Sequence, residues 1–371
     1  MPKIKILHII KSLGRGGAEM LLPETIRLHN SNQFEFHCIY FLPWKDQLVK
    51  TIQKTGTKVT CFKASNNMTI LLQYRRLVNY IRKEKIQIVH CHLPWAAFVG
   101  RLLHKFNGIH LIYSEHNKQE RYHPITAAIN KYSFNWQNSV IAVSEDVKLS
   151  ILKNIEPIVQ VKTVLNGVNT ERFNRQKYSA EEIRQKLNIK TNDPVIGNVA
   201  VFRTQKRLDL WIEQAAIIKA KFANAHFILV GDGPTQPLVH TKINDLGLTD
   251  CVHLPGRLEE VRPWLAAMDI FLISSKFEGL PIALLEALSM EVAVVTTNAG
   301  GIKEVIKHKE NGWIVDIDSP NDLSLGVISL LSDAKQKNQL AGSGRRTIEE
   351  DFSINKMVNS LEKEYLKAAR E

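Results

Sequence analysis

Cysteine is scarce in this sequence, and nothing in its spacing suggests a disulfide framework. The four cysteines are Cys38, Cys61, Cys91 and Cys251. No two of them form a Cys-x2-Cys pair, so a cysteine-rich zinc site is not predicted either. Cys91 lies between His90 and His92, which superficially suggests a metal site, but no second ligand pair accompanies it. A reducing, cytoplasmic compartment is the simpler interpretation.

Long apolar runs are also missing. No run approaches the roughly 20 apolar residues that cross a bilayer. The run at residues 6–10 leads straight into a glycine-rich stretch, unlike a signal peptide. We therefore expect a cytoplasmic protein that is soluble or attached peripherally to the inner face of a membrane.

Acidic residues are few in the first half of the chain. Residues 1–165 contain 23 Lys and Arg against 10 Asp and Glu, whereas the whole chain of 371 residues has a net charge of +12. Such a basic half indicates an anionic partner, either anionic lipid headgroups or a phosphate-bearing acceptor. Charge that serves only solubility is the plainer alternative, and no nucleic-acid partner is expected.

The sequence does contain a regular alternation of apolar, strand-like runs and helical patterns. A chain of this length is expected to hold two or three domains, and the alternation predicts α/β domains with parallel sheets. The runs on which the argument depends are residues 4–10, 86–92 and 109–114 in the first half and 195–202, 226–230 and 268–274 in the second. One amphipathic helix is predicted for residues 68–85.

Two carboxylates follow the run 268–274 in one strand–turn–helix unit. Glu278 falls in the turn, Gly279 permits close approach of a ligand, and Pro281 suits the first position of the next helix. Glu286 falls within that helix among apolar residues, where a ribose diol would supply the donors that a carboxylate needs. Free amides at the helix N-terminus would attract phosphate oxygens. The alternative is that Glu278 only caps the helix and Glu286 is an ordinary solvated residue.

A basic loop follows the run 195–202 and precedes another helix. Arg203 offers a fork for two phosphate oxygens, and Lys206 offers a point charge. Arg207 is expected to point to solvent. A solvated basic turn without a ligand is the alternative for the whole loop.

Glycines and histidines follow strands of the first half, at the sheet edge where ligands bind in open α/β folds. Gly16 and Gly17 come after the run 4–10, but their spacing departs from G-x-G-x-x-G, so a nicotinamide site is not favoured. His92 and His116 each follow the end of a predicted strand. Purely structural histidines remain an equal alternative to a ligand-binding pair.

Residues 278–286 resemble the E-x7-E signature of retaining glycosyltransferases of family 4. These enzymes have the GT-B fold, in which two Rossmann-like domains face each other across a cleft. Further stretches are similar to family motifs, namely Gly-Gly-Ala-Glu at 16–19, Asn-Gly-Val-Asn at 166–169 and Gly-Asp-Gly-Pro at 231–234. The resemblance covers nearly the whole chain and is strongest from 195 to 315.

The chain departs from the family pattern in two places. Ala200 and Val201 stand where the family often has Gly-Arg, so Arg203 is expected to supply the missing guanidinium and Lys206 is the firmer phosphate ligand. Glu291 and Ala293 stand where the family usually has glycine and proline, which leaves the local turn open. The effect of the first departure on activity does not follow from the sequence.

The resemblance implies a domain plan and an activity. Residues 1–170 would form the acceptor-side domain, 171–193 a linker, 194–351 the donor-nucleotide domain, and 352–371 a helix that packs back on the first domain. The reaction would be transfer of a hexose-type sugar, with retention, from a nucleoside-diphosphate sugar to a saccharide or lipid-linked acceptor in cell-envelope polysaccharide or glycoconjugate synthesis.

The resemblance also assigns roles to individual residues. Glu278 would hold a hydroxyl of the donor sugar, and His116 would hold the sugar or a phosphate from the opposite side, so these two are the catalytic candidates. The donor-binding candidates are Gly16, Gly17, Arg203, Lys206, Arg257 beside the nucleobase, Gly279, Leu280, Pro281 and Glu286. His92 and Glu304 are expected on the acceptor side, Glu304 at the start of a helix.

No metal ion is expected to take part, since no Asp-x-Asp pair stands where a divalent ion would be bound. Lys206, Arg203 and a helix dipole would instead stabilise the departing diphosphate. No cofactor is expected beyond a UDP- or GDP-sugar as donor. A sugar-nucleotide epimerase of the same fold and a non-catalytic nucleotide-sugar-binding protein are the alternatives. Donor sugar, base, acceptor, linkage and oligomeric state do not follow from the sequence.

Overall fold

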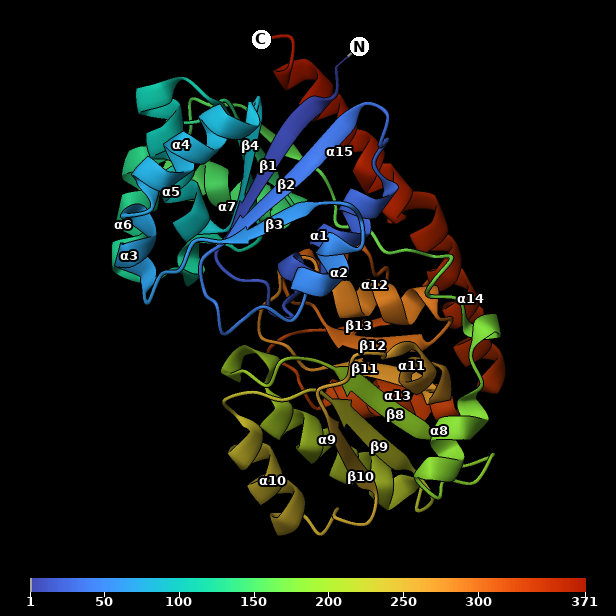
Figure 1. Ribbon diagram of the computed structural model, residues 1–371. Coiled ribbons are helices and arrows are strands. Elements are labelled where there is room, and N and C mark those ends of the chain that lie inside the picture. The colour runs from blue at the N-terminus through green and yellow to red at the C-terminus, as the bar shows by residue number, and fades with distance from the viewer. Residues whose placement is uncertain (1) are drawn as a thin grey trace. The chain divides into compact units, whose positions relative to one another are not determined.

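The chain divides into two compact units in the computed structural model, which describes residues 2–371 (Figure 1). Unit 1 comprises Met1–Asn166 and Ile354–Glu371, and unit 2 comprises Gly167–Ser353. Each unit is a parallel sheet covered by helices, so the prediction of an α/β protein with two parallel-sheet domains is confirmed.

Unit 1 is built on a seven-stranded sheet in the order β3-β2-β1-β4-β5-β6-β7, with every neighbouring pair parallel. The strands are β1 (Ile4–Ile10), β2 (Phe34–Tyr40), β3 (Lys58–Cys61), β4 (Ile88–His92), β5 (His110–Glu115), β6 (Ser139–Ala142) and β7 (Val161–Thr163). The chain runs outward from β1 to β3 and resumes on the other side of β1 with β4. The topological switch point, where ligands bind in such sheets, therefore lies between β1 and β4.

Helices cover both faces of this sheet because the strands are apolar on both sides. They are α1 (Gly17–Leu28), α2 (Val49–Gln53), α3 (Asn67–Leu71), α4 (Tyr74–Glu84), α5 (Pro94–Asn107), α6 (Pro124–Ser133), α7 (Glu145–Ile155) and α15 (Ile354–Ala368), with a short 3-10 helix η1 (Gln119–Arg121). On one face, Leu22 of α1 and Leu361 and Tyr365 of α15 pack on Ile6 and Ile10. Helices α4, α5 and α7 pack on the opposite face through a second buried cluster. The C-terminal helix is thus part of unit 1.

The single helix expected over 68–85 is two helices, α3 and α4. The break occurs because the backbone amide of Gln73 donates to Ile70 O at 3.1 Å instead of to Thr69. The side-chain amide of Gln73 donates to the Thr69 carbonyl at 3.5 Å, where the helical amide would have bonded. Met68 and Leu72 are exposed at 62% and 76%, beside the basic surface of α4.

Unit 2 contains a six-stranded parallel sheet in the order β10-β9-β8-β11-β12-β13. The strands are β8 (Val195–Val199), β9 (His226–Val230), β10 (Val252–Gly256), β11 (Ile270–Ile273), β12 (Ala293–Thr297) and β13 (Trp313–Val315). The strand order reverses between β8 and β11, which places a second switch point at the ends of these two strands.

The helices of unit 2 bury the sheet in the same way. They are α8 (Ala180–Lys186), α9 (Leu208–Lys221), α10 (Gln236–Asp245), α11 (Arg262–Ala267), α12 (Ile282–Ser289), α13 (Asp322–Ser332) and α14 (Ala334–Asp351), with 3-10 turns η2 (Arg175–Lys177), η3 (Thr204–Lys206) and η4 (Gly300–Glu304). Trp211 of α9 is fully buried, and its indole N–H donates to Leu272 O of β11 at 2.9 Å. Among residues 2–371, no helix has the length and apolarity to cross a membrane.

The stretch 171–193, expected as a linker, is packed into unit 2. Arg184 of α8 is buried, and its guanidinium donates to Ala267 O at 3.2 Å and to Asp269 at 3.0 Å. Because a buried arginine needs such partners, this segment is held firmly to α11 and the start of β11.

Candidate functional site

The loops after β8 and β11 meet at the switch point of unit 2. Lys206, in the loop after β8, places Nζ 2.5 Å from Oε1 of Glu278, which follows β11. Ser275 Oγ donates to the same oxygen at 2.6 Å. Both charged side chains are largely but not fully buried, with exposed fractions of 21% and 11%. The two residues predicted to hold phosphate and sugar are therefore partners of each other here.

Arg207 fastens these two loops together, and the expectation that it points to solvent is wrong. Its backbone is left-handed, with φ 47°, which turns the side chain toward the loop after β11. Its guanidinium donates to Ser274 O at 2.7 Å and to Ile317 O at 3.2 Å. Ser274 Oγ in return donates to the Lys206 carbonyl at 2.7 Å. Arg207 is thus a structural residue that fixes the position of Lys206.

Arg203 is exposed at the N-terminus of η3, and its guanidinium has no partner among the described residues. Ala200 and Val201 precede it, and Ala200 O lies 1.8 Å from the position of a Cβ on Gly231. Gly231 and Gly233 have φ of 134° and 154°, a backbone conformation that only glycine adopts readily. Glycine at these two positions also lets their backbone lie close to Ala200 and Phe202. Arg203 is consequently a free cation three residues before Lys206.

Arg257 follows β10 and pairs with an acidic residue of the neighbouring loop. Its Nη2 lies 2.6 Å from Oδ1 of Asp232, which follows β9. Both side chains are more than a third exposed, so this ion pair is weak and can rearrange around a ligand.

Helix α12 carries the remaining donor-side candidates. Pro281 is the N-cap residue, with an extended backbone at φ −71° and ψ 121°, and the helix begins one residue later than expected. No side chain of residues 2–371 caps the helix N-terminus. Glu286 is half-buried on this helix, and Gly279 O accepts from the amide of Gly301 at 2.9 Å.

Glu304 does not begin a helix. It is the last residue of η4, a short 3-10 turn. The glycines at its start and the β-branched Val305 and Ile306 that follow both disfavour an α-helix. Glu304 is half-buried.

In unit 1, the glycine loop forms the N-terminus of α1. Gly16 is the N-cap and Gly17 is the first helical residue. A Cβ on Gly16 would lie 2.4 Å from an oxygen of Glu19. Glu19 also accepts from Ser12 Oγ at 3.2 Å, so the loop is folded around this carboxylate.

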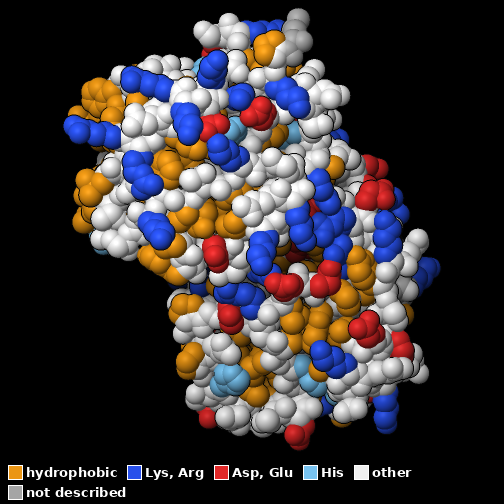
Figure 2. All heavy atoms as spheres, in the orientation of Figure 1, with side chains coloured by type: hydrophobic (Ala, Val, Ile, Leu, Met, Phe, Trp, Pro, Cys, Tyr) orange, Lys and Arg blue, Asp and Glu red, His pale blue; other side chains and the backbone are white. Residues whose placement is uncertain are grey.

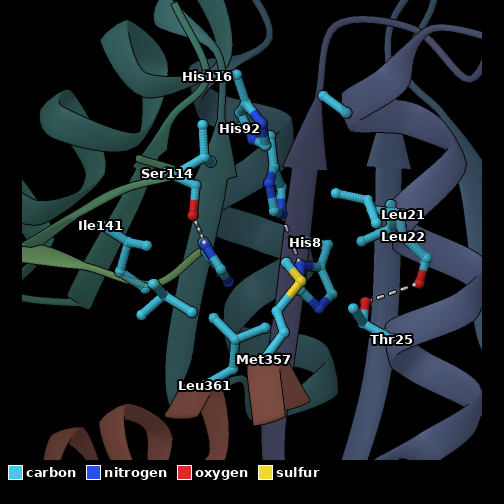
Figure 3. Close-up of a pocket in the computed structure, with 14 residues that line it drawn as sticks. His8, Leu21, Leu22, Thr25, His92, Ser114, His116, Ile141, Met357 and Leu361 are labelled. Atoms are coloured by element: carbon cyan, nitrogen blue, oxygen red, sulfur yellow. Dashed lines mark hydrogen bonds between the residues drawn. The ribbon is translucent and has the colours of Figure 1, made fainter. Parts of the chain in front are cut away.

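The structure brings His92 and His116 together, with ring centroids 5.8 Å apart. Both line a cavity in unit 1, as Figure 3 shows. Burial lowers the pKa of His116 to about 4, so its imidazole is neutral at neutral pH. Leu93, directly after His92, has φ 67°, a strained conformation for a non-glycine residue and one that occurs at functional sites.

Glu115 is a site residue that the sequence does not predict, because it belongs to no recognisable motif. It is fully buried, and its Oε1 accepts the amides of His116 at 3.0 Å and Asn117 at 3.1 Å. Its Oε2 accepts from Tyr113 OH at 2.7 Å and from Gln119 Nε2 at 2.8 Å. Burial raises its pKa. This carboxylate therefore fixes the loop that carries His116.

His8 and His90 were also missed as members of the cavity. His8 Nδ1 lies 3.0 Å from His92 Nε2, and His90 contacts Ser114 Oγ at 2.8 Å. The alternation of His90 and His92 on one strand was the available signal, because residues i and i+2 share a face. The pairing of β1 with β4, which adds His8, could not be read from the sequence.

Two family models match the chain. "Glycosyltransferase Family 4" matches residues 15–172, and "Glycosyl transferases group 1" matches residues 179–347. Together they cover most of both units.

Curated relatives are similar at low identity. One is N-acetyl-alpha-D-glucosaminyl L-malate synthase of Bacillus anthracis, 24% identical over 65% of this chain and 62% of that protein. Another is the UDP-Gal:alpha-D-GlcNAc-diphosphoundecaprenol alpha-1,3-galactosyltransferase of Escherichia coli, 23% identical over 98% of this chain and 97% of that protein.

Solved structures share the fold. The Anabaena protein HepE in complex with UDP-glucose has a TM-score of 0.86 at 19% identity. The match covers 98% of this chain and 100% of the HepE chain. A glycosyltransferase from Rickettsia africae has a TM-score of 0.83 at 20% identity, with 99% of both chains covered.

Proposed function

The chain belongs to the family-4 glycosyltransferases with the GT-B fold, and we propose that it transfers a sugar from a nucleoside-diphosphate sugar with retention of configuration. The acceptor is a saccharide or a lipid-linked saccharide of cell-envelope polysaccharide or glycoconjugate synthesis. The named E. coli relative, which uses UDP-Gal and a diphosphoundecaprenol-linked acceptor, supports this substrate class.

One observation carries the proposal, namely the Lys206–Glu278 pair at the switch point of unit 2. A donor diphosphate brings two negative charges to Lys206 and competes with Glu278 for its ammonium group. Once Lys206 turns to phosphate, Glu278 is free to accept a hydroxyl of the donor sugar. The pair therefore links arrival of the diphosphate to exposure of the sugar-binding carboxylate.

The departing diphosphate is stabilised by groups of this chain. Lys206 and Arg203 supply positive charge, and the uncapped N-terminus of α12 supplies amides and the positive end of a helix dipole. Preorganised donors of this kind are the largest catalytic contribution in many enzymes. Glu286 accepts from the ribose hydroxyls, Gly279, Leu280 and Pro281 bring backbone close to the donor, and Arg257 lies by the base.

Transfer proceeds without a metal ion at the diphosphate and without a further cofactor, with UDP- or GDP-sugar as the donor. The Asp-x-Asp sequence of this chain, at 316–318, follows β13, and there Asp316 Oδ1 accepts the amide of Asp318 at 2.8 Å. That carboxylate serves a turn. The cationic side chains take the role that Mg²⁺ has in other nucleotide-sugar enzymes.

Unit 1 supplies further groups to the reaction. Gly16 and Gly17 offer the donor backbone amides at the start of α1, and His116 contacts the sugar or a phosphate in its neutral form. The acceptor-side candidates are His92 of unit 1 and Glu304 of unit 2.

The basic surface of unit 1 attaches the protein to the inner, cytoplasmic face of an anionic membrane. Figure 2 shows Lys and Arg side chains spread over the visible face of this unit, with hydrophobic side chains among them. Helix α4 exposes Arg75, Arg76, Arg82 and Lys83, and α3 exposes Met68 and Leu72 beside it. Apolar residues rimmed by basic ones suit an anionic lipid surface, where a lipid-linked acceptor would be found.

A donor screen tests the proposal. The protein is incubated with UDP- and GDP-sugars, and thermal shifts identify the donor. Incubation with that donor in EDTA, with and without acceptor, then shows whether nucleoside diphosphate is released, and proton NMR gives the anomeric configuration of the product. Product sugar nucleotide without free diphosphate would identify an epimerase, and binding without turnover would identify a non-catalytic protein. Loss of turnover in EDTA that Mg²⁺ restores would overturn metal independence at the diphosphate.

A further inference from the structure

Three histidines of unit 1 lie on one face of two adjacent strands. His90 and His92 alternate on β4, and His8 on β1 pairs with His90 in the parallel register. One ligand nitrogen from each of the three lies within 4.8 Å of the others. Cys91 between them belongs to the buried cluster on the opposite face, so it does not join the group. A His-x-His strand beside a third histidine gives the tripod that a tetrahedral metal ion requires.

These histidines line a closed-in cavity beneath α1 and α15. Its volume is about 20 Å³, enough for one water molecule or one metal ion. In Figure 3, His92 lies between His116 and His8, with the hydrogen bond joining His92 to His8. His8 is 2% exposed, and its Nδ1 is the nitrogen that faces His92.

We propose that His8, His90 and His92 bind a divalent transition-metal ion of the Zn²⁺ class in this cavity. Imidazole nitrogens suit Zn²⁺, Co²⁺ and Ni²⁺ and suit Mg²⁺ poorly. The site lies within unit 1 and includes His92, which is also an acceptor-side candidate, and its test measures metal binding rather than transfer.

The geometry needs only small side-chain adjustments. Tetrahedral Zn²⁺ with Zn–N bonds of about 2.0–2.1 Å places its ligand nitrogens about 3.4 Å apart. The separation between His8 Nδ1 and His92 Nε2 is already 3.0 Å. In the protein without metal, an N–H of one of these two rings donates to the nitrogen of the other. When the ion binds, that ring changes tautomer, so that its proton moves to its other nitrogen and both facing nitrogens bind the metal. His90 becomes the third ligand when its Nε2 exchanges the Ser114 contact for the ion.

The surroundings of His90 supply the support that metal-bound histidines usually have. Its Nδ1 contacts Tyr365 OH of α15 at 2.7 Å, which orients the ring and leaves Nε2 for the ion. Ser114 Oγ, now 2.8 Å from Nε2, then stands beside the fourth coordination position. Metal binding therefore ties β1, β4 and α15 together.

Burial keeps these ligands in the neutral form that binds metal. It lowers the pKa of His8 to about 3 and lowers the pKa of His90 and His92 well below the usual range. The titratable groups that face the cluster are His29, His116 and Tyr365.

Calorimetric titration of the EDTA-treated full-length protein with Zn²⁺, and the visible spectrum of the Co²⁺ form, test the proposal. We expect one ion per chain, a tetrahedral Co²⁺ spectrum, and a higher melting temperature with metal. His8→Gln, His90→Gln and His92→Gln should each weaken binding at least 100-fold, while the exposed His240→Gln in unit 2 should leave it unchanged.

Tyr365→Phe keeps all three ligands and should weaken binding about 10- to 100-fold, as loss of a ligand-orienting partner does. The Tyr365→Phe variant therefore still tests the metal site if a histidine variant fails to fold. The proposal is overturned by the absence of 1:1 binding or by unchanged affinity in folded histidine variants.

Discussion

The ammonium group of Lys206 lies 2.5 Å from a carboxylate oxygen of Glu278, although 72 residues separate them in the chain. Ser275 Oγ shares the same oxygen. The pair stands where the strand order of unit 2 reverses, at the edge at which α/β sheets bind ligands. Each residue therefore affects how the other binds the donor. Substitution of Lys206 should lower nucleotide affinity, whereas substitution of Glu278 should slow transfer without lowering that affinity.

Lys206→Ala should weaken binding of the nucleoside diphosphate. A charge-assisted hydrogen bond to phosphate contributes about 1.5–3 kcal/mol, which corresponds to about 10- to 150-fold in affinity. The Glu278 carboxylate left unpaired would repel the diphosphate further. Calorimetry with UDP and GDP measures the effect, and the exposed Lys276 in the neighbouring loop provides the control Lys276→Ala. Equal affinities in the two variants would remove Lys206 from the site.

Glu278→Ala should slow transfer by ~10²-fold or more while nucleotide affinity stays level or rises, because Lys206 is released toward phosphate. Glu286→Ala should do the reverse, weakening nucleotide binding through loss of the ribose acceptor. Initial rates with varied donor, together with nucleotide titrations, separate kcat from binding. Parent-like turnover in both variants would refute the roles assigned to this pair of carboxylates.

Glu115→Gln tests whether the buried carboxylate positions His116. Glutamine keeps the shape but replaces one accepting oxygen by an NH2 group, which then meets an N–H or O–H donor. We expect kcat to fall about 10-fold with the donor KM unchanged, since the loop carrying His116 loses its anchor. Glu120→Gln, an exposed acid in the same loop, is the control. A rise in KM alone would show that the carboxylate serves donor binding instead.

The sequence was sufficient for features that arise from local pattern. Apolar runs predicted the parallel strands, and the turn and helix after β11 were placed with Glu278 and Glu286 in their observed elements. Backbone conformation at individual residues was harder to predict from the sequence. Glu291 has φ 53°, a left-handed conformation that favours glycine, and this explains why the family usually has glycine at this turn.

Long-range pairing accounts for what the sequence could not give. Arg207 reads as a solvated residue, yet three backbone carbonyls from the β11 loop and from residue 317 accept from its guanidinium. The partnership of Lys206 with Glu278, and of His8 with His90, depends on which strands become neighbours. Periodicity identifies a strand but does not specify its partner.

Stability should fall as the pH drops below about 6.5. Burial lowers the pKa of His8 to about 3 and of His90 and His92 well below normal, whereas in the unfolded chain all three titrate near 6.5. The unfolded state then binds more protons, so stability is complete above pH 6.5 and is lost toward the folded pKa values. Each histidine contributes up to roughly 1.4 kcal/mol per pH unit.

Urea unfolding in EDTA between pH 7.5 and 5 measures this slope. His8→Gln should reduce it by about one histidine's share, ~1.4 kcal/mol per pH unit at most, and the exposed His240→Gln should not change it. Glu115, whose pKa is raised, acts with the opposite sign and does not contribute to the loss. An unchanged slope in a folded His8 variant would contradict the assignment.

The basic surface of unit 1 should bind anionic vesicles in a salt-dependent way. Each Lys or Arg near such a surface contributes roughly 1 kcal/mol, so the four exposed cations of α4 give reversible attachment rather than insertion. Sedimentation with phosphatidylglycerol-containing liposomes should therefore be strong at low salt. It should weaken steeply as the screening length falls from ~10 Å at 0.1 M to ~3 Å at 1 M.

Changing Arg75, Arg76, Arg82 and Lys83 together to Gln should abolish this sedimentation and leave nucleotide affinity intact. The matched control changes four exposed cations of unit 2, namely Lys221, Lys307, Lys335 and Arg346, and should retain vesicle binding. Arg76 also stacks on Phe62, with the guanidinium 4.5 Å from the ring centroid. The melting temperature of the α4 quadruple variant is therefore recorded as a check on its folding. Absence of sedimentation at low salt in the parent protein, or equal loss in both quadruple variants, would favour a soluble saccharide acceptor over a lipid-linked one.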